Sequence, residues 1–308
     1  MHMRNRCEKN LSPKREIVII SLIMKALEYQ YNPAINFLEI DPKFIPEGVE
    51  YAKDNGYNNL RIRVLNSTFD DKYVLDFSPF KDFSDLTGLI IGDDFKIIKT
   101  IAISNIEELH NLSYLDLNPS ISINVSKLYS LTKLVIKNDQ NIIGLNRSAR
   151  LNSLQIFSTK HNDLTQLVGL NNLMDLTIIG GRIRNLEGIE HCPNITGLKL
   201  QYCKYLTNID VINSTKIQKL YIERCSKIKD LSCLEGNCNL NDVFIDNVES
   251  IRFVPSLFNL EKFRFWNCID GDLKPLLSNN HLIYIYFYPN KRHYTHSLNE
   301  ILDAKNNI

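Results

Sequence analysis

Apolar residues recur along this chain in one short pattern, a six-residue segment whose first, fourth and sixth positions are Leu, Ile, Val or Phe. Ten clear copies follow a degenerate first copy at Tyr57, Leu60 and Ile62, and the last copy ends before Asn290. The middle positions of the last seven copies are 20 to 23 residues apart: Leu154, Leu176, Leu198, Leu220, Val243, Phe263 and Ile285. Spacing this regular predicts a stack of one repeated unit rather than a single central core.

Within each copy, apolar and polar residues alternate over the last three positions, which predicts a short strand with one side toward the interior. The segment that returns to the next copy is patterned too, because Ile183, Leu186 and Ile189 follow one another at three-residue spacing. Such spacing predicts short 3₁₀-like turns on the outer side. No single copy can bury its apolar edge alone, so we expect about eleven parallel strands stacked along an elongated solenoid.

The 22-residue copies resemble the leucine-rich repeats of the bacterial internalins, which share the layout L-x-x-L-x-L-x-x-N-x-I-x-x-I-x-x-L. The resemblance covers about three quarters of the chain. The chain departs from the layout at the ninth position, where the family prefers Asn and this sequence has Asp94, Ser120, Asp139, Thr159, Gly181, Cys203, Cys225, Val248, Cys268 and Asn290. Cysteine there is similar to the cysteine-bearing members of the superfamily. The resemblance implies an α/β fold, a right-handed leucine-rich-repeat solenoid with parallel strands on its concave face, and it says little of function.

The beginning of the chain, residues 1–56, contains no copy of the pattern, and we expect it to form an N-terminal helical cap. Residues Arg15–Tyr31 are predicted to be one helix. A second helix is predicted to begin with Pro46 near its first turn and to stop at Gly56. The repeats are then expected to occupy residues 57–290.

The end of the chain, residues 291–308, is expected to form a C-terminal cap. Ser297 followed three residues later by Glu300 is a capping box, which predicts a short helix over Ser297–Ala304. The apolar residues of this helix are expected to cover the last coil: Leu298, Ile301 and Leu302. With both ends covered, we expect no appended catalytic domain.

Charge and composition narrow the classes of partner. The net charge is +1, from 36 Lys and Arg against 35 Asp and Glu, so no overall field draws the chain to nucleic acid or anionic lipid.

The apolar run at residues 17–24 is too short to span a bilayer and lacks a small-residue cleavage site, so it predicts a buried helix rather than a signal peptide. Seven cysteines do not form an even disulfide framework, which favours reduced thiols and the cytoplasm.

The polar positions three, five and seven of each copy are predicted to line the concave face. Aromatic residues, including the only Trp, gather in the last four rows of this lining. Together with the charged residues between them they are our candidate partner-binding residues: Tyr221, Glu223, Asp242, Phe244, Asp246, Lys262, Arg264, Trp266, Tyr284, Tyr286 and Tyr288. Large rigid rings beside charges have the composition of a protein-binding hot spot. The alternative for each ring is that it stacks on neighbours along the sheet and needs no partner.

Three other constellations carry weaker signals. Cys203 and Cys225 occupy equivalent positions of successive coils, and we expect a buried cysteine ladder there rather than a disulfide or a metal site. The Cys268-x-Asp motif resembles the nucleophile of bacterial ubiquitin ligases that carry such repeats, but it occupies a repeat position. His293 and His296 beside the aromatic rows suggest a platform for single-stranded nucleic acid, which the acidic residues of the same rows oppose.

The sequence therefore predicts a non-enzymatic scaffold without metal or cofactor, monomeric before it binds another protein. By analogy with the ribonuclease inhibitor, we expect a bacterial cytoplasmic inhibitor or immunity protein that neutralises a toxin domain, such as a nuclease, through its concave face. The alternative is a secreted effector or adhesin that binds a host protein, which an export signal would favour.

Overall fold

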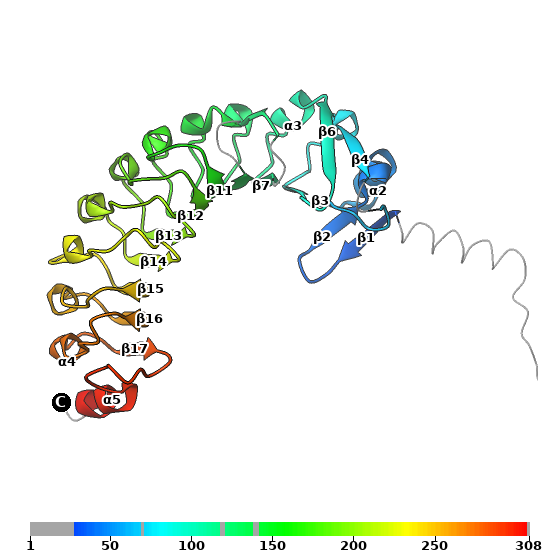
Figure 1. Cartoon of the computed structure of the whole chain (residues 1–308). Helices are drawn as coiled ribbons and strands as arrows, with labels where there is room; N and C mark the ends of the chain where they lie inside the picture. The colour runs from blue at the N-terminus through cyan, green and yellow to red at the C-terminus, as the bar shows by residue number, and fades with distance from the viewer. Residues whose placement is uncertain (1–27, 69–70, 118–120, 138–141, 307–308) are drawn as a thin grey trace, which may run out of the picture. The chain divides into compact units, whose positions relative to one another are not determined.

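The computed structural model describes residues 28–68, 71–117, 121–137 and 142–306 (Figure 1). These residues form two compact units, the first ending at Ile106 and the second beginning at Glu107, called unit 1 and unit 2 below. Both are built from strands that follow the repeat pattern and from short return segments, so each is described by its own sheet and its own coils.

Unit 1 contains one sheet of four strands and a second, two-stranded parallel sheet. The strands of the larger sheet, in spatial order, are β1 Tyr29–Asn32, β2 Phe37–Ile40, β3 Asn59–Ile62 and β5 Gly88–Ile91. The smaller sheet and the helical segments are β4 Lys72–Asp76, β6 Lys96–Ile101, η1 Pro42–Phe44, α2 Ile45–Asn55, η2 Ser78–Phe80 and α3 Ser104–Glu107, the last of which ends at the border with unit 2. Strand β1 pairs antiparallel with β2, and the other pairs of the larger sheet are parallel.

The first predicted helix is wrong at its end, although Glu28, the first residue that the structure describes, is helical. Most of the predicted Arg15–Tyr31 helix lies outside the described residues, but its last three residues belong to strand β1. The reason is tertiary contact, because Tyr29 is buried, pairs with Ile40 and packs its ring 4.8 Å from that of Tyr51. Burial against a neighbouring strand outweighs the weak helix preference of such a segment.

The stack also begins one strand earlier than predicted. Strand β2 pairs in parallel register with β3, which places Leu38 beside Leu60 and Ile40 beside Ile62. The second predicted helix is confirmed as α2, which ends at Gly56 with a positive φ of 72°. A left-handed residue at this position is where glycine costs least.

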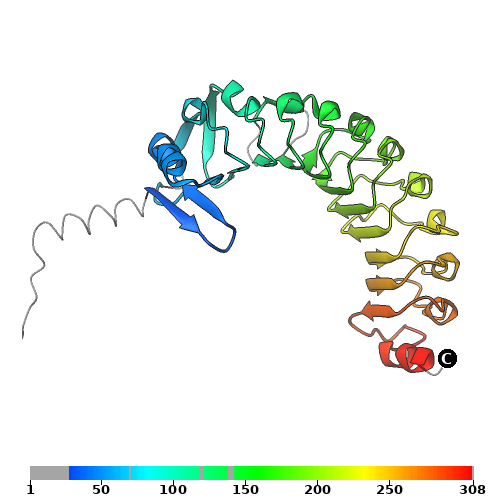
Figure 2. The same ribbon diagram turned by 180° about the vertical axis from the view of Figure 1, so that it is seen from behind.

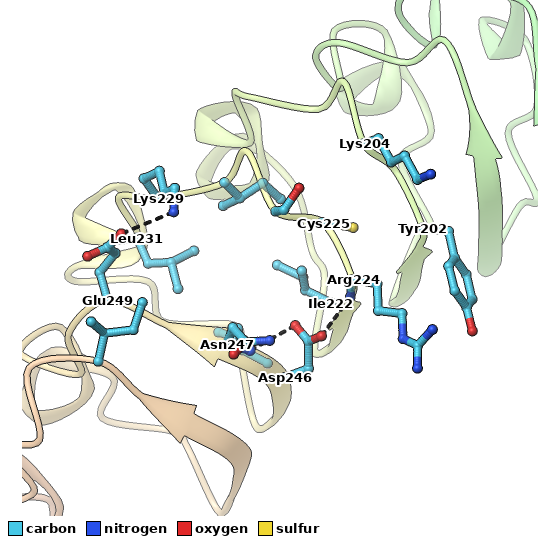
Figure 3. Close-up of a pocket in the computed structure, with 14 residues that line it drawn as sticks. Tyr202, Lys204, Ile222, Arg224, Cys225, Lys229, Leu231, Asp246, Asn247 and Glu249 are labelled. Atoms are coloured by element: carbon cyan, nitrogen blue, oxygen red, sulfur yellow. Dashed lines mark hydrogen bonds and ion pairs between the residues drawn. The ribbon is translucent and has the colours of Figure 1, made fainter. Parts of the chain in front are cut away.

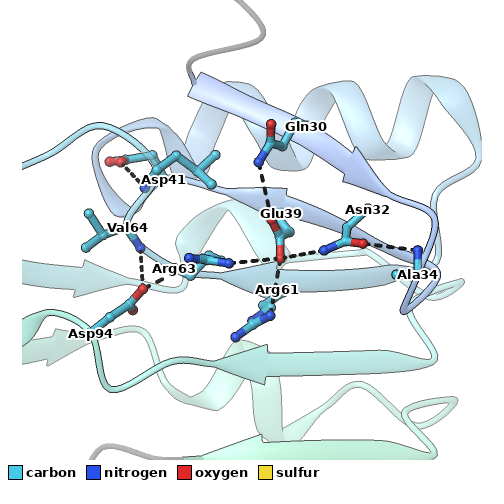
Figure 4. A network of polar contacts seen from close by, with 10 residues as sticks. Gln30, Asn32, Ala34, Glu39, Asp41, Arg61, Arg63, Val64 and Asp94 are labelled. Atoms are coloured by element: carbon cyan, nitrogen blue, oxygen red, sulfur yellow. Dashed lines mark hydrogen bonds and ion pairs between the residues drawn. The ribbon is translucent and has the colours of Figure 1, made fainter.

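A buried polar network fixes the start of unit 1 (Figure 4). The Glu39 side chain, 2% exposed, accepts hydrogen bonds from Arg61 at 3.2 Å and from Asn32 at 3.2 Å. Arg63 lies 3.5 Å from the same carboxylate and 3.7 Å from Asp94. The positive row formed by Arg61 and Arg63 is therefore already neutralised by carboxylates of the same unit, which weakens it as a site for an acidic partner.

Unit 2 is a regular stack of parallel strands with short helices on the opposite side (Figures 1 and 2). Its main strands, in both chain and spatial order, are β7 Tyr114–Leu117, β9 Lys133–Lys137, β11 Ser153–Thr159, β12 Asp175–Gly181, β13 Gly197–Gln201, β14 Lys219–Glu223, β15 Asp242–Val248, β16 Lys262–Cys268 and β17 Tyr284–Phe287. The return segments carry η3 Val125–Lys127, η5 Leu145–Arg147, η6 Thr165–Leu167, η7 Ile189–His191, η8 Asp210–Ser214, η9 Ser232–Leu234, η10 Val254–Ser256 and α4 Pro275–Ser278. Strands β8 Ile123–Asn124 and β10 Ile142–Ile143 form a small parallel pair, and α5 Leu298–Asn306 ends the unit.

The predicted repeat core is confirmed. Each predicted copy forms a strand, β3 and β5 in unit 1 and the nine main strands in unit 2, and these strands pair in parallel within their units. The middle positions stand in one register from Leu154 to Ile285, and none is more than 4% exposed. Ile183, Leu186 and Ile189 are fully buried, and a 3₁₀ helix begins at Ile189 as the spacing predicted. Burying each such side chain contributes about 1.5–3 kcal/mol, so the stack is stabilised coil by coil.

The C-terminal helix and its capping box are confirmed. The Ser297 N–H donates to Glu300 Oε2 at 2.7 Å, and the Glu300 N–H donates to Ser297 Oγ at 3.3 Å. Ile301 is fully buried, but Leu302 is 37% exposed, so the prediction that Leu302 covers the last coil is wrong. Tyr294, which was not among the residues predicted to cover the last coil, packs against it, because its ring lies 5.7 Å from the ring of Phe287.

We expect the matched pair Ile301→Ala and Leu302→Ala to differ sharply in stability. Ile301→Ala removes a fully buried side chain from the end of the stack and should cost about 2–4 kcal/mol, whereas Leu302→Ala should change stability by less than about 0.5 kcal/mol. Urea unfolding followed by circular dichroism measures both, and truncation after Asn290 should lower the midpoint at least as much as Ile301→Ala. Equal midpoints for all three variants and the parent chain would show that α5 covers nothing.

Candidate protein-binding face

The candidate residues belong to strands β14 to β17 of unit 2 or to the turn after β17. The strand face of this unit lies opposite its short helices (Figure 1). Parallel pairing aligns the fifth positions of the copies that form β13 to β17 in one row of cationic and aromatic residues. This row contains Lys199, Tyr221, Phe244, Arg264 and Tyr286. Neighbouring strands in a sheet lie about 4.8 Å apart, so these side chains are close enough to pack on one another.

Three rings of the row and of the adjacent position form one packed group. The rings of Tyr221 and Phe244 are stacked with centroids 4.4 Å apart, and the edge of Trp266 meets Phe244 at 5.2 Å. The Lys199 ammonium lies 4.7 Å from the Tyr221 centroid, and the Arg264 guanidinium lies 6.0 Å from that of Phe244. Phe244 is only 6% exposed as a result, so the prediction that it belongs to an exposed cluster is wrong. Tyr221 and Phe244 therefore fit the alternative interpretation, in which a ring stacks on its neighbours along the sheet and needs no partner protein.

The acidic candidates serve the fold as well. Asp246 is 5% exposed and accepts hydrogen bonds from the backbone N–H groups of Arg224 and Asn247, each at 2.8 Å, so its predicted exposure is wrong too. Glu223 accepts from Gln201 Nε2 at 2.6 Å and from the Tyr221 hydroxyl at 3.0 Å. Burial, together with Glu223, raises the pKa of Tyr221 to about 12, so this hydroxyl stays protonated and remains a donor.

The charged pair of Asp242 and Arg264 is formed within the chain. Arg264 Nη2 lies 2.5 Å from Asp242 Oδ1, and the two side chains are 35% and 23% exposed. The Nε of Arg264 is buried without a hydrogen-bond partner. The Arg264 guanidinium is thus held by Asp242 while part of it stays exposed to solvent. A side chain that is already ordered loses little conformational entropy when a partner binds.

The remaining candidates are open to solvent. Trp266, Tyr284, Tyr286 and Tyr288 are 43%, 48%, 45% and 69% exposed, and Lys262 between them is exposed. We call these four rings the exposed aromatic group. They come from only two strands and the turn that follows the second one, so large rigid apolar surfaces lie close together at one end of the strand face.

A hollow beside these rings was not predicted from the sequence. A depression of about 410 Å³ on the strand face is lined by Ser153, Asp175, Leu176, Thr177, Gly197, Leu198, Lys199, Lys219, Leu220, Tyr221, Asp242 and Arg264. Gly197 stands in register between Asp175 and Lys219, and the Asp175 carboxylate occupies the position where a side chain of residue 197 would begin. A glycine between two charged residues at this lining position is the only feature of the lining that the sequence marks.

Four cysteines are buried packing residues rather than reactive groups: Cys192, Cys203, Cys225 and Cys268. Cys203 Sγ lies 3.4 Å from the Gln201 carbonyl and Cys225 Sγ lies 3.4 Å from that of Glu223, so each thiol repeats the contact of the coil before, as a ladder requires. Cys268 is fully buried, and burial, together with Asp270, raises its pKa to about 12. A thiol that stays protonated is a poor nucleophile, which argues against the ligase-like motif. Among the described residues, no three His, Cys, Asp or Glu side chains are placed to hold a metal ion.

We expect thiol labelling to follow this burial. Cys7 lies outside the described residues, so the experiment uses Cys7→Ser, which leaves six cysteines. Burial raises the pKa of Cys192 to about 11 and that of Cys233 to about 12, whereas Cys238 is exposed, so one thiol of the six should react quickly at neutral pH. All six should react after denaturation without reductant. Recovery of only four would reveal a disulfide and contradict the ladder.

Comparison with known proteins supports the fold. No family model matches the sequence, and no curated protein matches it. The structure is similar to that of an internalin (inlF) from Listeria monocytogenes, with a TM-score of 0.58 and 18% identity over 89% of this chain and 78% of that chain. An internalin C2 (inlC2) from the same species aligns with 17% identity over 79% of this chain and 84% of that chain, at a TM-score of 0.37. In the described part of this chain no helix is long and apolar enough to cross a membrane.

Proposed function

We propose that this leucine-rich-repeat chain is a non-enzymatic scaffold that binds another protein through the C-terminal rows of its strand face. The observation that carries the proposal is the exposed aromatic group, which stands beside the fixed Arg264 and the packed Tyr221 and Phe244. Exposed rings that flank an already ordered polar pair supply contact area at little entropic cost, as hot spots do. The solvent-facing residues proposed for contact are Lys262, Arg264, Trp266, Tyr284, Tyr286 and Tyr288.

The partner that we propose is a toxin domain, which the chain blocks by covering it. The rigid stack presents an ordered surface rather than a cleft with a nucleophile and a base, so binding itself is the activity that it supports. The hollow described above is shallow and lined by charged residues, small residues and leucines, which suits a protrusion of a protein surface. An inhibitor of this kind works in the compartment where the toxin would act, here the cytoplasm.

Growth protection tests this function. A toxin domain encoded beside this chain is expressed in a bacterial host, alone or with the chain, and we expect the chain to restore growth. The double variant Trp266→Ala and Tyr286→Ala should lose protection while circular dichroism shows an unchanged fold. Phe258→Ala, which removes another exposed ring of unit 2, 63% exposed but not in a strand, is the matched control and should protect fully. Full protection by the double variant would contradict the proposed site, and a toxin that never forms a complex with the parent chain would contradict the inhibitor role.

A further inference from the structure

A second recess lies away from the strand face, where the chain leaves strands β13 to β15 (Figure 3). It has a volume of about 690 Å³ and is lined by residues at the ends of these strands and in the segments that follow them. Its position coincides with the longest step of the regular stack, because Leu220 and Val243 are 23 residues apart instead of 22. The recess belongs wholly to unit 2, and Trp266 does not line it.

The backbone explains the opening. The pairing of β14 with β15 ends at Ile222 and Ile245, whereas β15 remains paired with β16 as far as Val248. Beyond that point the Arg224 N–H is bonded at 2.8 Å by the carboxylate of Asp246 instead of by the ladder. The side chain thus replaces the missing backbone bond, and the strands are free to separate at their ends.

The floor of the recess is aliphatic. Ile222, Ile228, Leu231 and Ile245 line it, and each is 9% exposed or less. The Cys225 thiol at the same level is already directed at the carbonyls of its own stack. An aliphatic floor can bury an apolar side chain, but it has no hydrogen-bonding side chain for the polar edge of a nucleobase or for a sugar.

The rim is cationic. Lys204, Arg224 and Lys229 line it, and only Lys229 is engaged with a carboxylate, that of Glu249 at 3.4 Å. In the part of the chain that the structure describes, no carboxylate lies within 4.0 Å of the charged nitrogens of Lys204 or Arg224. The Arg224 guanidinium instead covers the exposed ring of Tyr202 at 5.1 Å. Asp246, the other acid of the lining, is buried and occupied by two backbone N–H groups.

We propose that this recess binds a short acidic segment of a partner protein, with one apolar side chain on the aliphatic floor and carboxylates on Lys204 and Arg224. An apolar floor with a positive rim matches an apolar side chain flanked by acidic residues in both chemistry and sign. This inference rests on the proposed function because the ligand is again a protein, but the recess is a different surface from the strand face. Single-stranded nucleic acid, the other anionic polymer, would leave the aliphatic floor without a counterpart.

The test is a titration of the full chain, labelled at the Ile and Leu methyl groups, with the peptide acetyl-Asp-Glu-Phe-Glu-Asp-amide. We expect saturable shifts at the methyl groups of Ile222, Ile228 and Leu231. The Lys204→Glu and Arg224→Glu double variant should bind about tenfold more weakly or worse. The matched control is Lys216→Glu, an exposed lysine before the other end of β14, which should bind like the parent.

Three outcomes would overturn the inference: no shift of the floor methyl groups up to the solubility of the peptide, equal shifts with Phe replaced by Ala in the peptide, or shifts of the same groups produced by an oligothymidylate instead. The Trp266→Ala chain should give the same peptide shifts as the parent. Because the peptide titration needs neither Trp266 nor the partner, this proposal and the strand-face proposal fail independently.

Discussion

Replacing Trp266 or Tyr286 by Ala is expected to weaken binding of the partner by about 2 kcal/mol or more, which is roughly thirtyfold in Kd. Both side chains are almost half exposed in the free chain, at 43% and 45%, so their loss opens no cavity in the repeat core. Trp266 also packs on the ring of Phe244 at a steep angle, so its removal uncovers part of a ring that stacks on Tyr221. The two variants should therefore lose affinity and keep their unfolding midpoint, as calorimetric titration and urea unfolding would show.

Replacing different charged residues of the same face should weaken partner binding to different degrees. Arg264→Ala leaves Asp242 without its cation and should weaken binding more than Lys262→Ala, whose ammonium is at the exposed rim. The control for all these variants is Phe258→Ala. If Phe258→Ala weakens binding as much as Trp266→Ala, the loss reflects general apolar surface and contradicts a local hot spot.

Replacing Asp41 by Ala is expected to destabilise the chain by about 3 kcal/mol, because several donors lose their buried acceptor at once. The Asp41 carboxylate is fully buried and accepts from the N–H groups of Leu65 at 2.9 Å and Asn66 at 3.1 Å. It also accepts from the Lys43 N–H at 3.1 Å and the Ser67 hydroxyl at 2.8 Å. Asp54→Ala removes an exposed carboxylate from α2 and should cost less than about 0.5 kcal/mol.

The stability that Asp41 contributes should depend on pH, and the direction of this dependence follows from its pKa. Burial alone would raise the pKa of Asp41, but its hydrogen bonds outweigh burial and hold the pKa below the usual value. A depressed folded pKa contributes stability that is fully present above the unfolded pKa of about 4 and is lost as pH falls through the folded value. Urea midpoints measured between neutral pH and pH 3 should therefore converge for Asp41→Ala and the parent chain on acidification. A difference that stays constant with pH would contradict this account of Asp41.

The features that the sequence predicted are those that depend on local periodicity. The register of Leu154 with its equivalents, the 3₁₀ helix at Ile189 and the capping box at Ser297 all follow from residues within one or two turns of each other. What the sequence missed depends on contacts between coils. Strand β2 was not predicted because it contains Glu39, a charged residue whose burial is tolerable only with partners from other strands, among them Arg61 and Arg63.

The candidate site divides in the same way. Period-2 alternation correctly assigned Tyr284 and Tyr286 to the exposed side of β17. It could not show that Phe244 would be covered by Tyr221 and Trp266, because that depends on the register of three strands. The recess between β14 and β15 depends on one extra residue and one side-chain hydrogen bond, which periodicity does not report.

Hydroxyl-radical footprinting of the chain with and without its bound partner tests the central claim most directly. In the free chain Trp266, Tyr284, Tyr286 and Tyr288 should oxidise readily, as should Tyr129, which is 64% exposed and does not lie in a strand. The account predicts that the partner protects the first four rings and leaves Tyr129 unchanged. Oxidation of the four rings that persists in the complex would contradict the claim that the C-terminal rows of the strand face bind the partner.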